Sequence, residues 1–391
     1  MTRAVPHRTI RLGFMPLLDA AIPIIAADKG FAAEHGLDLQ LIRESSWANI
    51  RDRLAIGHFE AAHMLAPMSV AAALGLTPLD SPLIAPMALG PGGNAITVSD
   101  ALWQAMRAGD EGLTANDPVA IGAALKAAIR ASARKLTFAV VHPYSAHNYE
   151  LRYWLAASGI RPDVDVEIAI LPPPLMPDAL ASGSVDGFCV GEPWNSNAAR
   201  RFGGRIILTK SAIWRGGPEK VLGLRADWAA DHPQPVTALI RAMLDAARWC
   251  ADPANAGELA GILAGPTRLN LPVEDIVAPL DGTMRLADGV PITLGSAGIF
   301  GGGLANLPSP EAALWFLSQM IRWGQAAMSP QAIDRAKASF TPDLFLACCS
   351  PAKGDASSAA QALTSAFFDD RPFDPDTLAA YVAGQTARDR A

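Results

Sequence analysis

The chain has few cysteines and no cysteine motif. Its 391 residues include four of them, Cys189, Cys250, Cys348 and Cys349, and no two form a C-x-x-C pair. Adjacent cysteines such as Cys348 and Cys349 rarely bond to each other, so we expect no disulfide framework. This pattern favours a reducing compartment.

An excess of positive charge is also missing. The sequence has 32 Lys and Arg against 38 Asp and Glu, for a formal net charge of -6. Its nearest basic cluster, "NAARRFGGR", is short and mixed. Because a nucleic-acid surface needs clustered Lys and Arg, we expect no direct nucleic-acid partner.

Long uninterrupted apolar runs are absent as well. Residues 61–79 carry no formal charge, but two prolines and a glycine divide them, which argues against a membrane helix. The opening "MTRAVPHRTIRLGFMPLLDAAIPIIAADKG" predicts a strand, a proline turn and a helix. Asp19 and Pro23 interrupt the apolar stretch that a signal peptide would need. We therefore expect a cytoplasmic protein without membrane contact.

What the sequence does contain is an alternation of strand-like and helix-like segments. "IRLGFMPL", "LDLQLIRE" and "EAAHMLAP" predict strands, and "SSWANIRDRLAIGHF" predicts a helix capped by Ser45 or Ser46. A second strand–helix series begins at "KLTFAVV". This order predicts an α/β fold with two lobes, residues 1–98 plus 222–391 in the first and 99–221 in the second. The ligand cleft is expected between the lobes, where loops follow the strands.

The stretch "VVHPYSAHNYELRYWLAASGI", residues 140–160, raises the question of a metal site. His142 and His147 are five residues apart, whereas zinc proteases use i, i+4 with a glutamate between. Glu150 at i+3 from His147 would suit a di-iron bundle, but this architecture lacks the further helices with carboxylates. We expect no metal and no cofactor. A helix that begins near Ser145 would instead offer backbone N–H groups to a small anion, or His147 would merely cap or pack that helix.

Motifs for catalysis are missing too. There is no G-x-S-x-G elbow, and "GPGGNAIT" lacks the Lys and Ser/Thr of a phosphate-binding loop. An enzyme is therefore the weakest hypothesis.

Several segments together resemble one known family. "SSWANIRDRL", "HMLAPM", "GNAITVS", "HNYELRYWLAASGI", "GFCVGEPWN", "PEKVLG" and "GGLANLPSPEAALWFLSQMIRWGQ" are similar, in this order, to the nitrate- and bicarbonate-binding proteins of ABC transporters. The resemblance covers most of the chain and implies a two-lobed, type II periplasmic-binding-protein fold. It is closer to a cytoplasmic branch, NasS, whose members sense nitrate and nitrite. They hold the RNA-binding antiterminator NasT without ligand and release it with ligand.

The resemblance also implies a set of ligand-binding residues. By motif they are Trp47, Gly90, Asn94, His147, Pro173 and Lys220. The transport proteins have glutamine in place of Asn94, so the shorter side chain leaves room for a water. The bicarbonate-binding branch has an acid in place of Lys220, which favours nitrate here.

These residue types suit a planar monoanion physically. Lys220 would supply a fixed charge with three donors, while His147 and Asn94 would supply directional donors. Trp47 would supply an indole N–H or an apolar wall. Two alternatives stay open, in which Lys220 is a solvated hinge residue paired with Glu219 and Trp47 is a core residue.

The leading functional hypothesis is a cytoplasmic nitrate and nitrite sensor that sequesters and then releases a NasT-like antiterminator. The alternative is the substrate-binding component of a nitrate ABC transporter. Outside the site, His63 is expected to be a satisfied core histidine, Glu192 a structural residue, and Trp194 a core residue.

Overall fold

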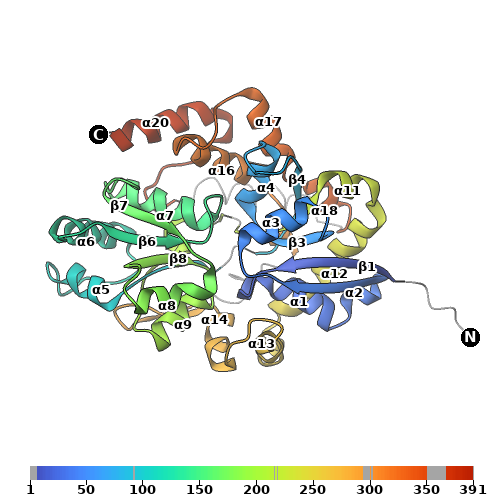
Figure 1. Cartoon of the computed structure of the whole chain (residues 1–391), viewed down its shortest axis with the longest axis horizontal. Helices are drawn as coiled ribbons and strands as arrows, with labels where there is room; N and C mark the ends of the chain where they lie inside the picture. Colours follow the sequence, from blue (N-terminus) through green and yellow to red (C-terminus); the bar gives the residue numbers. More distant parts are fainter. Residues whose placement is uncertain are drawn as a thin grey trace, which may run out of the picture.

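The computed structural model describes residues 7–90, 93–214, 216–217, 219–293, 300, 303–349 and 367–390. They form two α/β lobes that lie side by side (Figure 1). Each lobe is built on a five-stranded sheet, so the predicted two-lobed α/β fold is confirmed.

The first lobe contains a mixed sheet with two parallel and two antiparallel pairs of neighbouring strands. Strand β1 pairs parallel with β2 and β3, while β10 runs antiparallel to β3 and β4. In sheet order the strands are β2 (Leu37–Arg43), β1 (Arg8–Phe14), β3 (Ala61–Leu65), β10 (Lys220–Arg225) and β4 (Leu83–Ala88). The helices and the 3-10 turn of this lobe are η1 (Leu18–Ala20), α1 (Ala21–Asp28), α2 (Phe31–Glu34), α3 (Trp47–Ala55), α4 (Ala66–Ala73), α11 (Ala226–Asp231), α12 (Pro233–Ala251) and α18 (Pro342–Leu346).

The second lobe repeats this design. Strand β6 pairs parallel with β7 and β8, and β5 runs antiparallel to β8 and β9. In sheet order the strands are β7 (Val166–Ile170), β6 (Leu136–Val140), β8 (Gly187–Val190), β5 (Ala95–Val98) and β9 (Arg205–Thr209). Its helical segments are α5 (Asp100–Arg107), α6 (Pro118–Ala131), α7 (Ala146–Ala157), η2 (Pro173–Leu175), α8 (Met176–Ala181), α9 (Trp194–Arg201) and α10 (Lys210–Ile213).

The chain crosses between the lobes earlier than predicted. Strand β5, placed in the first lobe by the predicted boundary after residue 98, belongs to the second sheet. The predicted boundary after residue 221 falls inside β10, which belongs wholly to the first sheet. The two crossings therefore lie between β4 and β5 and between the helix that ends at Ile213 and β10. Both errors arise because a strand's sheet is decided by its distant partners and not by its own sequence.

The C-terminal part is not confined to the first lobe as predicted. The hairpin β11 (Thr283–Arg285) and β12 (Pro291–Thr293) lies against the second lobe, where Ala287 N donates to Ile206 O at 2.8 Å. The remaining described segments are η3 (Pro253–Asn255), α13 (Ala256–Ala264), η4 (Val273–Asp275), α14 (Val277–Leu280), η5 (Gly303–Asn306), α16 (Pro310–Arg322), α17 (Pro330–Ala338), η6 (Pro375–Thr377) and α20 (Leu378–Arg390).

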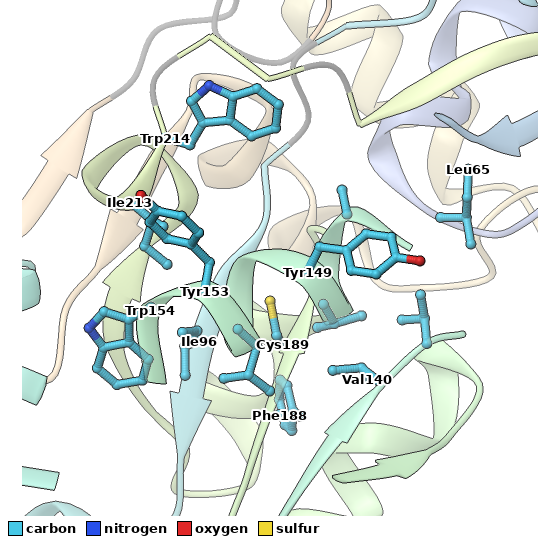
Figure 2. Close-up of a cluster of buried hydrophobic side chains, with 14 of the residues drawn as sticks. Leu65, Ile96, Val140, Tyr149, Tyr153, Trp154, Phe188, Cys189, Ile213 and Trp214 are labelled. Carbon is cyan, nitrogen blue, oxygen red and sulfur yellow. The ribbon is translucent and has the colours of Figure 1, made fainter. Parts of the chain in front are cut away.

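A single apolar cluster crosses the junction of the lobes. Figure 2 shows Tyr149, Tyr153 and Trp154 of α7 together with residues of β5, β6 and β8, and Leu65 of β3 lies in the same cluster. Helix α7 has almost all of its residues buried, so its N-terminus is held firmly at the junction. No helix among the described residues is both long and apolar enough to cross a membrane.

Candidate functional site

Lys220 lies at the centre of a buried polar group where the lobes meet. It is the first residue of β10, and its side chain is fully buried. Its Nζ lies 2.8 Å from Asp19 Oδ2, donates to Glu219 and lies 5.2 Å from the centre of the Trp47 ring. In the alternative of a solvated hinge residue paired with Glu219, the solvated part is therefore wrong, whereas the pairing with Glu219 is present.

The backbone around Lys220 is fixed from both sides. Ala66 N, at the start of α4, donates to Glu219 O at 3.0 Å, and Leu89 N donates to Lys220 O at 2.9 Å. Gly90 follows Leu89 with φ of 124°, a value that a side chain rarely allows, so the chain leaves β4 through a glycine beside Lys220.

His63 extends this group into the first lobe. It is buried on β3, with Nε2 2.9 Å from Asp19 Oδ1, and its ring lies 5.4 Å from that of Trp47. Trp47 opens α3 directly after the N-cap Ser46, whose side chain accepts from Asn49 N. His63 was expected to be an ordinary core residue. It is buried, but it also supports the carboxylate that pairs with Lys220.

His147 approaches the same group from the second lobe. Helix α7 begins at Ala146 with Ser145 as its cap, so His147 lies in the first turn, as predicted, and His142 lies in the preceding loop. His147 is fully buried, and its Nε2 lies 3.2 Å from Glu219 Oε1. The positive end of α7 therefore faces the second crossing, which suits an anion.

Burial and neighbouring charges set the protonation of this group. Burial lowers the pKa of His147 well below its ordinary value, and Lys220 lowers it further. Burial raises the pKa of Asp19, but Lys220 and His63 outweigh burial and bring it below the ordinary range. Burial lowers the pKa of Lys220, but Asp19 and Glu219 outweigh it, so the net shift is upward. Burial raises the pKa of Glu219. The centre is thus a charged Lys220–Asp19 pair beside a neutral imidazole.

The side-chain amide of Asn94 makes one hydrogen bond among the described residues. Asn94 lies in the first crossing, where its backbone O accepts from Lys210 N at 2.9 Å. Its Nδ2 donates to Glu150 Oε2 at 3.3 Å, which uses one of the two N–H groups of the amide. The amide keeps a second N–H, so the ligand-binding role of Asn94 stays a prediction.

Glu150 and Lys210 form a second buried pair that the sequence did not indicate as a site. Glu150 Oε1 lies 3.7 Å from Lys210 Nζ, which also donates to Gly217 O. The two residues come from α7 and α10, sixty positions apart, so no local pattern reveals them. Glu150 is three residues after His147, which places both on one face of α7.

Two direct hydrogen bonds join the lobes beside this group. Trp194 Nε1 donates to Pro16 O at 3.0 Å, and Leu18 N donates to Glu192 O at 2.9 Å. A Cβ on Gly191 would lie 3.1 Å from the Leu17 side chain, so a glycine permits this close approach. Trp194 was predicted to be core only, and its cross-lobe role was missed.

Pro173 is the predicted residue that the contacts do not tie to the others. It is buried at the start of η2, directly after β7. No polar contact within the described ranges links it to Lys220 or His147, so its ligand-binding role stays a prediction.

Several buried polar atoms of the group have no hydrogen-bond partner among the described residues. They are Trp47 Nε1, His63 Nε2, both ring nitrogens of His147, Asn94 Oδ1, and one carboxylate oxygen each of Asp19, Glu150 and Glu219. Buried polar atoms are paired in about nine of ten cases, and a small polar ligand would supply donors or acceptors to atoms that lack partners here. In the part of the chain that is described, no cluster of three His, Cys, Asp or Glu side chains is arranged to hold a metal.

Comparison with known proteins identifies the family of this chain. A family model described as NMT1-like matches residues 3–264, well over half of the chain. The chain belongs to the NMT1-like family. Within this family it is 34% identical over 391 residues to "Nitrate/nitrite binding protein NrtA" of Synechococcus elongatus, covering 96% of this chain and 85% of that protein. It therefore groups with the nitrate- and bicarbonate-binding proteins, as the motifs predicted.

A solved structure of a related protein has the same fold as this chain. The crystal structure of the periplasmic nitrate-binding protein NrtA from Synechocystis PCC 6803 superposes with a TM-score of 0.86 at 28% identity, covering 98% of this chain and 100% of that one. The predicted periplasmic-binding-protein fold is confirmed.

Other relatives are longer proteins. The chain is 38% identical over 320 residues to "Bicarbonate transport ATP-binding protein CmpC" of Synechococcus elongatus, which is 81% of this chain. It spans only about half, 45%, of that protein's length.

Proposed function

We propose that the chain binds nitrate or nitrite in the buried group around Lys220. The observation that carries this proposal is the unpartnered Trp47 Nε1 and His147 imidazole beside a buried lysine, at the positive end of α7. The name of the nitrate/nitrite-binding relative and the fold of the nitrate-binding structure support it.

The chemistry of nitrate suits these atoms. Nitrate is planar and weakly basic, so it needs donors and a positive charge, and no proton acceptor. The Lys220 ammonium, the Trp47 indole N–H and one N–H of a neutral His147 supply these. A charge-assisted hydrogen bond contributes roughly 1.5–3 kcal/mol, and a few of them, less desolvation, suit micromolar affinity.

Bicarbonate is the competing ligand, because relatives of both kinds match this chain. Lys220 stands where the resemblance gives the bicarbonate branch an acid, which favours nitrate. We also propose a binding protein and not an enzyme. Burial raises the pKa of Cys189 well above its ordinary value, and the Glu150 and Glu219 carboxylates raise it further, so this thiol is a poor nucleophile.

Titration calorimetry of the full chain with nitrate, nitrite and bicarbonate tests the ligand. We expect binding of nitrate or nitrite with micromolar affinity and weaker binding of bicarbonate, since Lys220 stands where the resemblance gives the bicarbonate branch an acid. Chloride at equal ionic strength controls for nonspecific anion effects. A flat nitrate trace with a strong bicarbonate response would contradict the proposal.

For the biological role we propose a cytoplasmic sensor that holds a NasT-like antiterminator and releases it on binding nitrate. The motif resemblance to the NasS branch supports this role. When a ligand closes the two lobes, the surface that they share changes. This change can release a partner only if the partner binds the open form and the closed form with different affinities. The substrate-binding component of a nitrate transporter is the second candidate, supported by the transport proteins among the relatives.

Release of the partner separates these two roles. We expect the chain and a NasT-like protein to co-elute in size-exclusion chromatography without ligand and to separate with millimolar nitrate. His147→Ala should form the same complex but resist nitrate, because its donor to the anion is lost. Failure to form any complex, together with recovery of the natural protein from a periplasmic or membrane fraction, would favour the transport role.

A further inference from the structure

The two carboxylate oxygens of Glu150 face different partners. Glu150 lies on α7 and is 1% exposed. Its Oε2 accepts from Asn94 Nδ2 at 3.3 Å, and its Oε1 lies 3.7 Å from Lys210 Nζ. A carboxylate has no proton to donate, so it turns the amide of Asn94 with the NH₂ group toward itself.

The opposite end of that amide, Asn94 Oδ1, is therefore directed elsewhere. It is buried and has no hydrogen-bond partner among the residues that are described. It lies 3.3 Å from the point where a Cβ on Gly191 would sit, and Asp19 Oδ2 lies 3.7 Å from the same point. The carbonyl oxygen of Asn94 is therefore within about 7 Å of Asp19 Oδ2, the oxygen that pairs with Lys220, so it lies beside the proposed anion site.

We propose that Glu150 is a positioning residue that sets the anion preference of the site, by holding Asn94 with its carbonyl toward the ligand. This inference rests on the proposed anion site. A bare carbonyl repels an oxyanion that has no proton, so nitrate needs a bridging water that donates to both. An anion with an O–H group, such as bicarbonate, can donate to Asn94 directly.

Lys210 makes this inference testable by a single isosteric change. In Glu150→Gln the new amide has one acceptor and one donor end, and the Lys210 ammonium, which only donates, takes the acceptor end. The donor end then faces Asn94, so the Asn94 amide must turn to accept. Its NH₂ group would then face the ligand and favour nitrate.

Calorimetric titration of the full chain with nitrate and with bicarbonate at about pH 8 measures the effect. We expect Glu150→Gln to raise the ratio of nitrate to bicarbonate affinity by about tenfold, the effect of one neutral hydrogen bond gained and one repulsion removed. Glu167→Gln makes the same change on the exposed surface of β7 and should leave the ratio unchanged. Equal changes in both affinities, or no change, would overturn the inference.

Two further measurements separate positioning from simple damage. In an Asn94→Ala background, Glu150→Gln should no longer shift the ratio, and a persistent shift would show that Glu150 does not act through Asn94. The Asn94 side-chain amide resonance, identified by its loss in Asn94→Ala, should move on Glu150→Gln even without anion. If the wild-type chain binds neither ion, the proposed function fails. In that case the Asn94 amide resonance still reports the orientation of the amide. An unchanged resonance in Glu150→Gln would contradict the positioning role of Glu150.

Discussion

Replacing Lys220 with methionine is expected to weaken nitrate binding by about 10- to 100-fold and to destabilise the fold. The affinity falls because a charge-assisted hydrogen bond, worth roughly 1.5–3 kcal/mol, is lost. Stability falls because Asp19, 2% exposed, loses the ammonium 2.8 Å away and must then either carry an unpaired buried charge or take up a proton. Removing one partner of a buried pair costs about 3–5 kcal/mol. Calorimetry and urea unfolding measure the two effects separately.

A double variant distinguishes these effects. Lys220→Met combined with Asp19→Asn removes both charges, so much of the stability should return, while nitrate affinity stays low. Lys337→Met, an exposed lysine on α17, makes the same side-chain change away from the site and should alter neither property. Nitrate binding at wild-type strength by the double variant would show that the Lys220 charge does not hold the anion.

Local sequence patterns were sufficient to predict most elements of the fold. The spacing of apolar residues predicted β1, β2 and β3, and the caps Ser46 and Ser145 begin α3 and α7 as expected. Sheet membership was harder, because β5 and β10 each pair antiparallel with strands far away in sequence. Nothing within those short strands says which sheet they join.

The candidate site was likewise predicted only in part from the sequence. Motif resemblance selected Lys220, His147 and Trp47, and the structure brings these side chains into one buried group. The partners that fix their charge, Asp19 above all, were missed because Asp19 lies 201 residues from Lys220. The direction of the Asn94 amide could not be predicted either, because it depends on a contact with Glu150, 56 residues away.

Glu192 is a buried carboxyl group, and its ionisation should make the free energy of unfolding depend on pH. It is 2% exposed and accepts only from Ser196 N and Oγ among the described residues. Burial raises its pKa to about 8, despite these hydrogen bonds, from the ordinary value of 4.5. Below that ordinary value, folded and unfolded chains both hold the proton, so folding carries no penalty there.

As pH rises, the unfolded chain releases this proton first. Stability therefore falls through the window from about pH 4.5 to about pH 8, by at most about 1.4 kcal/mol per pH unit. Glu192→Gln does not titrate and can still bond to Ser196, so its advantage in unfolding free energy over the wild type should grow across this window. We expect that advantage to reach a few kcal/mol, on the order of 3–4, by about pH 8.

Urea unfolding of both proteins at several pH values between about 5 and 8.5 checks this result. Other groups with shifted pKa values, such as Glu219, titrate equally in both proteins and cancel in the difference. Glu167→Gln, on the exposed surface, should show no growing difference from the wild type. A constant difference between Glu192→Gln and the wild type would mean that the Glu192 pKa is close to its ordinary value. In that case the Glu192 side chain would be a charged and hydrated carboxylate, and not the neutral acid inferred from its burial. It would lie at the point where Leu18 N and Glu192 O join the two lobes.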